Sequence, residues 1–74
     1  MDELQTVVLR KDLAEHGLRS GDVGAVVYVH SPEAYEVEFV SGEGHTVAVV
    51  TLESSDLRPI QEREILHVRD LAQI

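Results

Sequence analysis

The amino-acid sequence contains no cysteine and no tryptophan, and it has one phenylalanine and two tyrosines. Without cysteine, disulfide bonds, thiolate zinc sites and cysteine nucleophiles are excluded, and a reducing cytoplasm is the compartment that we expect. No apolar run approaches the roughly 18 residues of a membrane span, and Met1-Asp2-Glu3-Leu4 lacks the basic start of a secretory signal. The sequence therefore predicts a cytoplasmic protein that contacts no membrane and builds its core mainly from aliphatic side chains.

Basic residues are also scarce. Six Lys and Arg residues stand against fourteen Asp and Glu residues, which gives a formal net charge of -8 at pH 7. This charge repels nucleic-acid phosphates and anionic lipid, and it favours another protein with a basic surface as the partner. The alternative interpretation is that the charge serves only solubility. Either way, nucleic acid is a poor candidate for the partner.

Short stretches rich in β-branched residues alternate with turn residues along the first 60 of the 74 residues. They predict strands at residues 4–9, 23–30, 34–40, 46–52 and 57–60, with a single helical turn at residues 54–56. The clearest strand is 34–40, where Tyr35, Val37 and Phe39 alternate with Glu36 and Glu38. These residues form one domain, because no repeat, low-complexity segment or linker divides them.

Two further features shape the expected fold. Gly24 predicts a bulge or sharp bend near the start of the second strand, since glycine is unfavourable inside a strand. Leu13 and Leu18 are the apolar residues of the polar loop at residues 10–22, and we expect them to cover one open end of the core.

Short strands joined by tight turns describe a meander that closes on itself, because closure removes the exposed edges of a small sheet. The predicted fold class is therefore all-β, a small five-stranded SH3-like barrel, with an open meander sheet as the main alternative. The predicted core takes apolar residues from every strand: Val7, Leu9, Val23, Val26, Val29, Tyr35, Val37, Phe39, Val47, Val49, Leu52 and Leu57.

Residues 61–74 form a C-terminal tail of different character. Its charged residues surround Ile65, Val68, Leu71 and Ala72 at a spacing near helical periodicity. We expect a short helix, although Leu66 and Val68 would also suit a strand. The apolar residues of the tail would form either a lid over the barrel mouth, which we favour, or a surface that docks a partner.

Six short stretches between residues 4 and 60 form a recognisable series: Thr6-Val7-Val8-Leu9, Asp12-Leu13, Glu15-His16-Gly17-Leu18, Gly21-Asp22-Val23-Gly24, Tyr35-Glu36-Val37-Glu38-Phe39 and Leu57-Arg58-Pro59. Together they resemble a family of small bacterial proteins known as a domain of unknown function, with the pattern TVVL…DLPEHGL…GDVGTVV…YEVEF…LRP. Ala14 stands where the family often has Pro, and Ala25 where it often has Thr.

Two more distant likenesses concern the fold and the role of such a protein. Residues 21–29 followed by residues 35–39 are similar to the KOW-type SH3-like barrels of transcription and ribosome-associated proteins, which implies the barrel fold. The bacterial family itself resembles the small acidic members of two-gene modules, such as antitoxins and immunity proteins. Fold likeness does not carry function, because small barrels host many unrelated ones.

No motif in the sequence organises catalysis or ligand binding. There is no nucleophile elbow and no phosphate-binding glycine loop, and a barrel this small has little room for a substrate pocket. The histidines His16, His30, His45 and His67 lack the spacing of metal ligands. We therefore expect no catalytic residue, no cofactor and no metal site, and a protein that is not an enzyme.

Two groups of residues are candidates for binding a partner. Glu36 and Glu38 lie on one face of their strand as an acidic stripe, and Tyr28 on the preceding strand is a candidate interface anchor beside it. The second group is the set of apolar tail residues Ile65, Leu66, Val68 and Leu71, which could also form a homodimer contact.

We interpret the chain as an acidic protein-interaction module, such as the neutralising partner of a basic toxin or effector. A KOW-like barrel that binds nucleic acid or the ribosome is the alternative.

Overall fold

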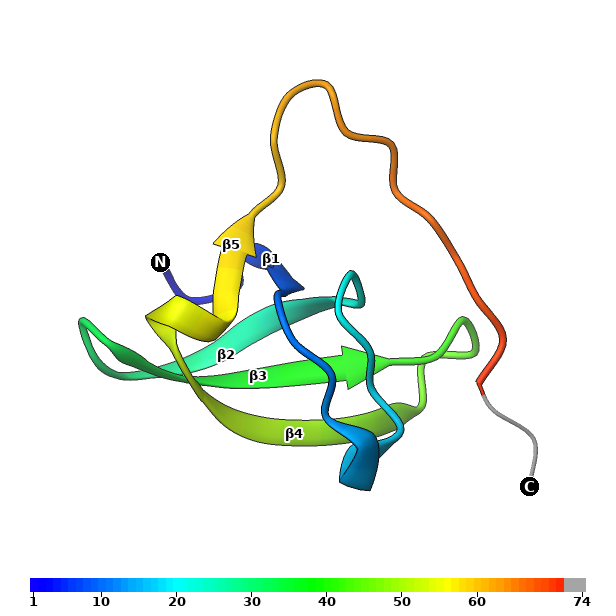
Figure 1. The fold of residues 1–74 in the computed structure, drawn as a ribbon. Coiled ribbons are helices and arrows are strands. Elements are labelled where there is room, and N and C mark those ends of the chain that lie inside the picture. Colours follow the sequence, from blue (N-terminus) through cyan, green and yellow to red (C-terminus); the bar gives the residue numbers. More distant parts are fainter. Residues whose placement is uncertain (72–74) are drawn as a thin grey trace.

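The computed structural model describes residues 1–71, which form a five-stranded antiparallel sheet with the strand order β4-β3-β2-β1-β5 (Figure 1). Two short 3-10 turns, η1 and η2, interrupt the connections, and no α-helix occurs in residues 1–71. The elements are β1 (Thr6–Leu9), η1 (Ala14–His16), β2 (Val23–Ser31), β3 (Ala34–Val40), β4 (Thr46–Glu53), η2 (Ser54–Asp56) and β5 (Leu57–Pro59). The mostly-β fold, its five strands and the single turn before the last strand confirm the sequence prediction at this level.

Strand β3 lies between β2 and β4 and shows why this sequence forms a sheet with two different faces. Tyr35, Val37 and Phe39 are buried, and each residue between them is only half-buried. Because side chains alternate across a strand, Glu36 and Glu38 point to the opposite, outer face. The alternation read from the sequence is therefore confirmed along the whole of β3.

The core lies on the inner face of the sheet and combines residues from all five strands with Leu18 from the β1–β2 loop. The ten buried side chains are each at most 6% exposed: Val7, Val8, Leu9, Leu18, Val26, Tyr35, Val37, Phe39, Leu52 and Leu57. Eight of these were predicted; Val8 and Leu18 were not in the predicted core. Val23 is half-buried, and Val47 is half-buried against the core cluster.

The prediction is wrong for two residues that it placed in the core. Val49 is 51% exposed, because the pairing of β4 with β3 places Ala48 opposite Phe39 and Leu52 opposite Tyr35. Ala48, Val50 and Leu52 thus face inward, whereas Val49 and Thr51 face outward. The sequence does not show this, because β4 carries apolar residues on both faces. Val29 is 36% exposed, since β2 shifts register twice beyond Val26 and its last four residues are all exposed.

Gly24 is needed for close packing between strands. A Cβ atom at this position would lie 2.9 Å from the Glu38 carbonyl oxygen and 2.9 Å from side-chain carbons of Val37 and Phe39. The register irregularities in β2 fall after Val26, not at Gly24. The bulge predicted at Gly24 is therefore placed wrongly, and the glycine is explained by the approach of β3.

The long β1–β2 loop folds back as expected. Leu13 and Leu18 form an isolated antiparallel bridge, with the Leu13 amide donating to the Leu18 carbonyl oxygen over 2.9 Å. Leu18 is 3% exposed and Leu13 packs against the same cluster. Gly17, in the left-handed conformation with φ of 70°, ends the 3-10 turn between them.

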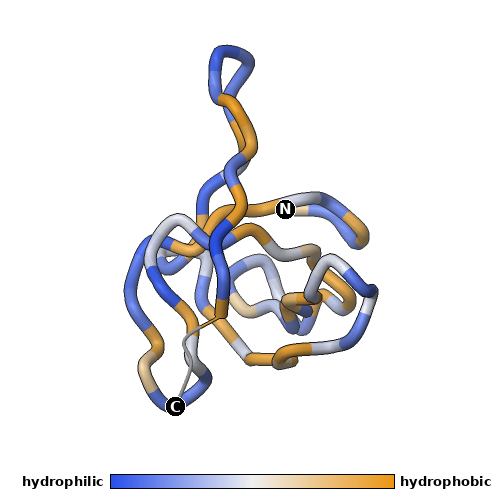
Figure 2. The backbone as a smooth tube through the Cα atoms, turned by 90° about the vertical axis from the view of Figure 1, so that its right-hand side faces the viewer, coloured by the Kyte–Doolittle hydropathy of each residue, from blue (hydrophilic) through white to orange (hydrophobic). Residues whose placement is uncertain are grey.

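The C-terminal tail contains no helix over residues 61–71, which contradicts the prediction; residues 72–74 of that prediction lie outside the described part. After a turn at Glu62 and Arg63 the chain runs without regular structure. Figures 1 and 2 show it as an arch that projects from the sheet and returns toward the β3–β4 connection. A helix this short is marginal in water unless packing buries one face, and Ile65 and Val68 remain 92% and 90% exposed.

Candidate functional site

The outer face of β2, β3 and β4 brings together the residues of the predicted acidic stripe. Pairing across the three strands forms two rows, in which Tyr28, Glu36 and Thr51 are neighbours and Ala25, Glu38 and Val49 are neighbours. We call the surface formed by Tyr28, His30, Glu36, Glu38, Thr46, Val49 and Thr51 the acidic face. It contains the three strand residues that sequence reasoning proposed for partner binding.

Glu36 is held in one orientation by two neighbours. Its Oε2 lies 2.8 Å from His30 Nε2, and its Oε1 accepts a hydrogen bond of 2.8 Å from the Thr51 hydroxyl. The contact with His30, followed by the bond from Thr51, holds the pKa of the Glu36 carboxyl below its usual range. Glu36 is therefore a carboxylate at neutral pH, with a fixed direction and with lone pairs left for a further donor.

Glu38 and Tyr28 extend this arrangement along the face. The Thr46 hydroxyl donates to Glu38 Oε2 over 2.6 Å. Tyr28 is 53% exposed, and its ring meets the His30 ring edge-on with centroids 4.9 Å apart. An aromatic ring, an imidazole and a carboxylate thus follow one another across β2 and β3, and the ring of Tyr28 remains accessible from solvent.

The distribution of charge singles out this part of the sheet. No Lys or Arg occurs between Arg19 and Arg58, and the stretch that includes β2, β3 and β4 carries Glu33, Glu36, Glu38, Glu43 and Glu53. Three of the six basic residues pair with acids elsewhere: Lys11 with Asp56, Arg58 with Glu64 and Arg69 with Asp22. Within residues 1–71 the carboxylates of Glu36 and Glu38 bond to His30, Thr46 and Thr51, and neither forms an ion pair with Lys or Arg.

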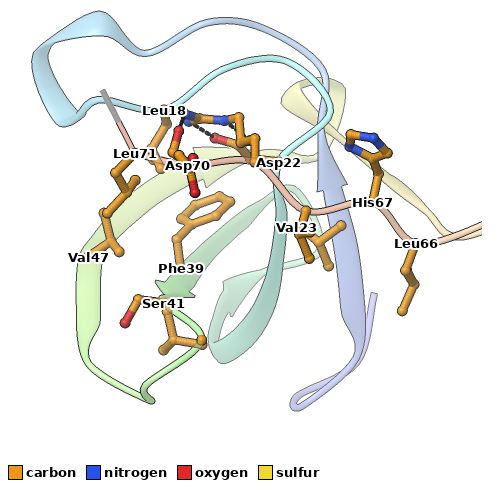
Figure 3. A pocket seen from close by; sticks show the side chains of 14 residues that line it. Leu18, Asp22, Val23, Phe39, Ser41, Val47, Leu66, His67, Asp70 and Leu71 are labelled. Carbon is orange, nitrogen blue, oxygen red and sulfur yellow. Dashed lines mark hydrogen bonds and ion pairs between the residues drawn. The ribbon is translucent and has the colours of Figure 1, made fainter. Parts of the chain in front are cut away.

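The apolar tail residues lie at a different place. Leu66, Val68 and Leu71 line a pocket of about 900 Å³, together with Leu18, Val23, Phe39 and Val47 from the sheet and the β1–β2 loop (Figure 3). Ile65 lines a smaller hollow nearby, of about 90 Å³. Neither hollow includes Tyr28, Glu36 or Glu38, so the structure separates the two groups of predicted partner-binding residues.

An ion pair fastens the tail over the pocket. Arg69 Nε donates to Asp22 Oδ1 over 2.8 Å, and Arg69 Nη2 donates to Oδ2 over 2.6 Å and to the Gly17 carbonyl oxygen over 2.9 Å. The bond from Arg69 is the main cause that lowers the pKa of the Asp22 carboxyl. Sequence reasoning missed this pair, because 47 residues separate its members and Arg69 lies in no recognisable motif.

Two other kinds of feature, a metal site and a membrane-spanning helix, were sought among residues 1–71. No group of three or more His, Asp or Glu side chains in residues 1–71 is arranged to hold a metal ion. The described residues also include no helix that is long and apolar enough to span a membrane.

Comparison with known proteins gives a family but no characterised relative. No curated protein and no solved structure matches the chain. Residues 3–59 match the family model of a domain of unknown function, DUF4926, and this range covers β1 to β5 and excludes the tail. The chain therefore belongs to the DUF4926 family.

Proposed function

We propose that this protein is an interaction module that uses the acidic face to bind a basic surface of another protein. The observation that carries the proposal is the absence of Lys and Arg between Arg19 and Arg58, combined with two oriented carboxylates, Glu36 and Glu38, at the centre of the three strands. A surface of one charge sign steers an oppositely charged partner and rejects like-charged ones.

The side chains of the acidic face suit a guanidinium or ammonium group. A cation placed over the exposed ring of Tyr28 would gain a cation–π interaction and lie near the Glu36 carboxylate, because Tyr28 and Glu36 are paired across the strands. The hydroxyls of Thr46 and Thr51 already orient the two carboxylates. Fixed acceptors lose less entropy on binding than mobile ones, so this face is prepared for its partner.

Two finer proposals accompany this one. The strand order β4-β3-β2-β1-β5 and the 3-10 turn that leads into β5 support closure of the sheet into an SH3-like barrel. The resemblance of the family to small acidic members of two-gene modules supports a neutralising role, in which the partner is a basic toxin or effector.

Nucleic-acid binding is not favoured, since Lys11, Arg58 and Arg69 are each engaged by a carboxylate.

A titration with an arginine-rich peptide, followed by amide chemical shifts, tests the acidic face. The variant Glu36→Gln/Glu38→Gln removes two charges from the face, and Glu15→Gln/Glu62→Gln removes two from exposed positions elsewhere. We expect shifts concentrated at Tyr28, Glu36 and Glu38, and a loss of affinity of about tenfold or more in the first variant, because each lost charge contact costs on the order of 1 kcal/mol. Equal weakening in both variants would mean that only net charge matters and would refute a defined site.

A further inference from the structure

The final segment of the tail, residues 65–71, is held to the domain by side chains alone. No backbone–backbone hydrogen bond within residues 1–71 involves this segment. Its fastening is the Arg69 guanidinium, which reaches both Asp22 oxygens and the Gly17 carbonyl oxygen. Detaching the segment therefore breaks one cluster of polar contacts and leaves every strand pairing intact.

The segment also fills its pocket incompletely. Leu66, Val68 and Leu71 are 65%, 90% and 45% exposed although all three line the cavity. In Figure 3, Leu71 lies beside Val47 and near Phe39, whereas Leu66 points away from Phe39. Space beside apolar side chains thus remains open between the tail and the sheet.

The domain supplies a preformed acceptor site for a guanidinium group at the rim of this pocket. The Arg19 amide donates to Asp22 Oδ2 over 2.8 Å, which fixes the carboxylate, and the Asp22 side chain is only 17% exposed. The Gly17 carbonyl adds a third acceptor atom in the same direction. A planar fork of N–H donors matches this arrangement, and an ammonium group does not match it equally.

The loop and sheet side of this pocket includes Leu18, Asp22, Val23, Phe39 and Val47, and we call it the latch groove. We propose that the latch groove is a second docking site for the protein partner, and that residues 68–71 occupy it as an internal substitute until the partner binds. The segment of the partner that binds carries an arginine that pairs with Asp22 and Gly17, and an aliphatic residue two positions later that packs against Val47 and Phe39. Arg69 and Leu71 have these two roles in the tail. This inference rests on the proposed function only in taking the partner to be a basic protein, since the groove and the acidic face share no residue that either argument uses.

The charge of the chain decides which occupant displaces the tail. A second copy carries the same net charge of -8 and is repelled by the first. A basic protein is attracted by the same field, and it can offer arginine at a local concentration that the acidic face raises. The groove therefore favours an arginine-bearing segment of a basic partner over the tail of another copy.

A short peptide and the full chain test this inference. The peptide repeats residues 67–71, His-Val-Arg-Asp-Leu, whose Arg and Asp charges balance, so that general attraction to an acidic protein contributes little. Binding is followed by amide shifts of Gly17, Asp22, Phe39 and Val47. The Arg69→Ala variant removes the ion pair and leaves the loop and sheet residues of the groove unchanged. We expect it to bind the peptide about tenfold or more tightly than the unaltered chain, where the tail competes.

Two controls make the result decisive. The peptide with Arg replaced by Gln should not shift the groove amides of Arg69→Ala, because it lacks the fork that Asp22 accepts. Glu36→Gln/Glu38→Gln combined with Arg69→Ala should bind the first peptide as well as Arg69→Ala does, which separates the groove from the acidic face. Equal binding to Arg69→Ala and the unaltered chain, equal binding of both peptides, or no groove shifts at millimolar peptide would overturn the inference. Concentration-dependent dimerisation of Arg69→Ala through these same amides would assign the groove to a second copy and would also overturn it.

Discussion

At the scale of single residues, two valines on neighbouring strands show how position decides the cost of a substitution. Val37 on β3 is 0% exposed, whereas Val49 on β4 is 51% exposed. We expect Val37→Ala to lower the free energy of unfolding by about 2 kcal/mol through lost burial and a residual cavity, and Val49→Ala to change it by about 0.5 kcal/mol or less. Urea denaturation of both variants measures this, and similar losses would contradict the inward register of β4.

Gly24 and Gly42 differ in whether the surrounding structure has room for a side chain. A Cβ at Gly24 would meet a backbone oxygen and two side chains at 2.9 Å, whereas a Cβ at Gly42 would meet nothing within 4 Å. Overpacking costs about 1–3 kcal/mol, so Gly24→Ala should destabilise the protein by an amount in this range. Gly42→Ala should lie within about 0.5 kcal/mol of the parent in the same thermal melt. A stable Gly24→Ala protein would show that β3 does not approach β2 this closely.

At the scale of elements, the sequence predicts a strand well where its two faces differ in chemistry. In β3 the polar residues Glu36 and Glu38 mark the outer face, so the pattern alone is sufficient. In β4 both faces carry β-branched residues, and the inward set follows only from the pairing Phe39–Ala48 and Tyr35–Leu52. The short-range pattern of β4 contains no information about this pairing, which is why Val49 was assigned to the wrong face.

The helix predicted in the tail is absent for a related reason. Its apolar spacing resembles that of a helix, but a helix needs a surface that buries one of its faces. The actual fastening, Arg69 with Asp22, joins residues 47 positions apart and leaves Val68 90% exposed. Long-range ion pairs leave no periodic signal, so neither the extended tail nor the latch groove could be predicted from the sequence.

The same ion pair predicts a pH dependence for the tail. The bond from Arg69 lowers the pKa of the Asp22 carboxyl, and the Arg19 amide and charge act in the same direction. A group whose pKa is lowered in the latched state contributes stability above its ordinary pKa, and this contribution is lost as the pH falls through the lowered value. We therefore expect the tail to detach as the pH falls below about 4.

Hydrogen exchange and amide line widths of residues 68–71 measure this detachment, with the amides of Val7 and Val37 as the reference for global unfolding. The Arg69→Ala variant, which has no ion pair to titrate, should show a detached tail at every pH. Tail amides that follow the core amides throughout the acid range would contradict the role assigned to Asp22.

At the scale of the whole molecule, charge is arranged by region. Within residues 1–71 the ion pairs of Lys and Arg lie at the β1–β2 loop, η2, β5 and the tail, and the strands β2, β3 and β4 contain no Lys or Arg. The net charge of -8 favours a basic partner from composition alone, and this stays a prediction. Which face carries that charge follows only from the strand order and the alternation along β3, so the acidic stripe was foreseen and its hydrogen-bonded framework of His30, Thr46 and Thr51 was not.

The central claim is that the acidic face selects a basic protein. Its most direct test is quantitative affinity capture from the native host with three immobilised baits: the unaltered chain, Glu36→Gln/Glu38→Gln, and the matched control Glu15→Gln/Glu62→Gln. We predict that the unaltered chain and the control retain the same basic protein and that the face variant loses most of it, because only the face variant removes carboxylates that contact the partner. Retention of the same proteins by all three baits, or loss from both variants alike, would contradict the claim.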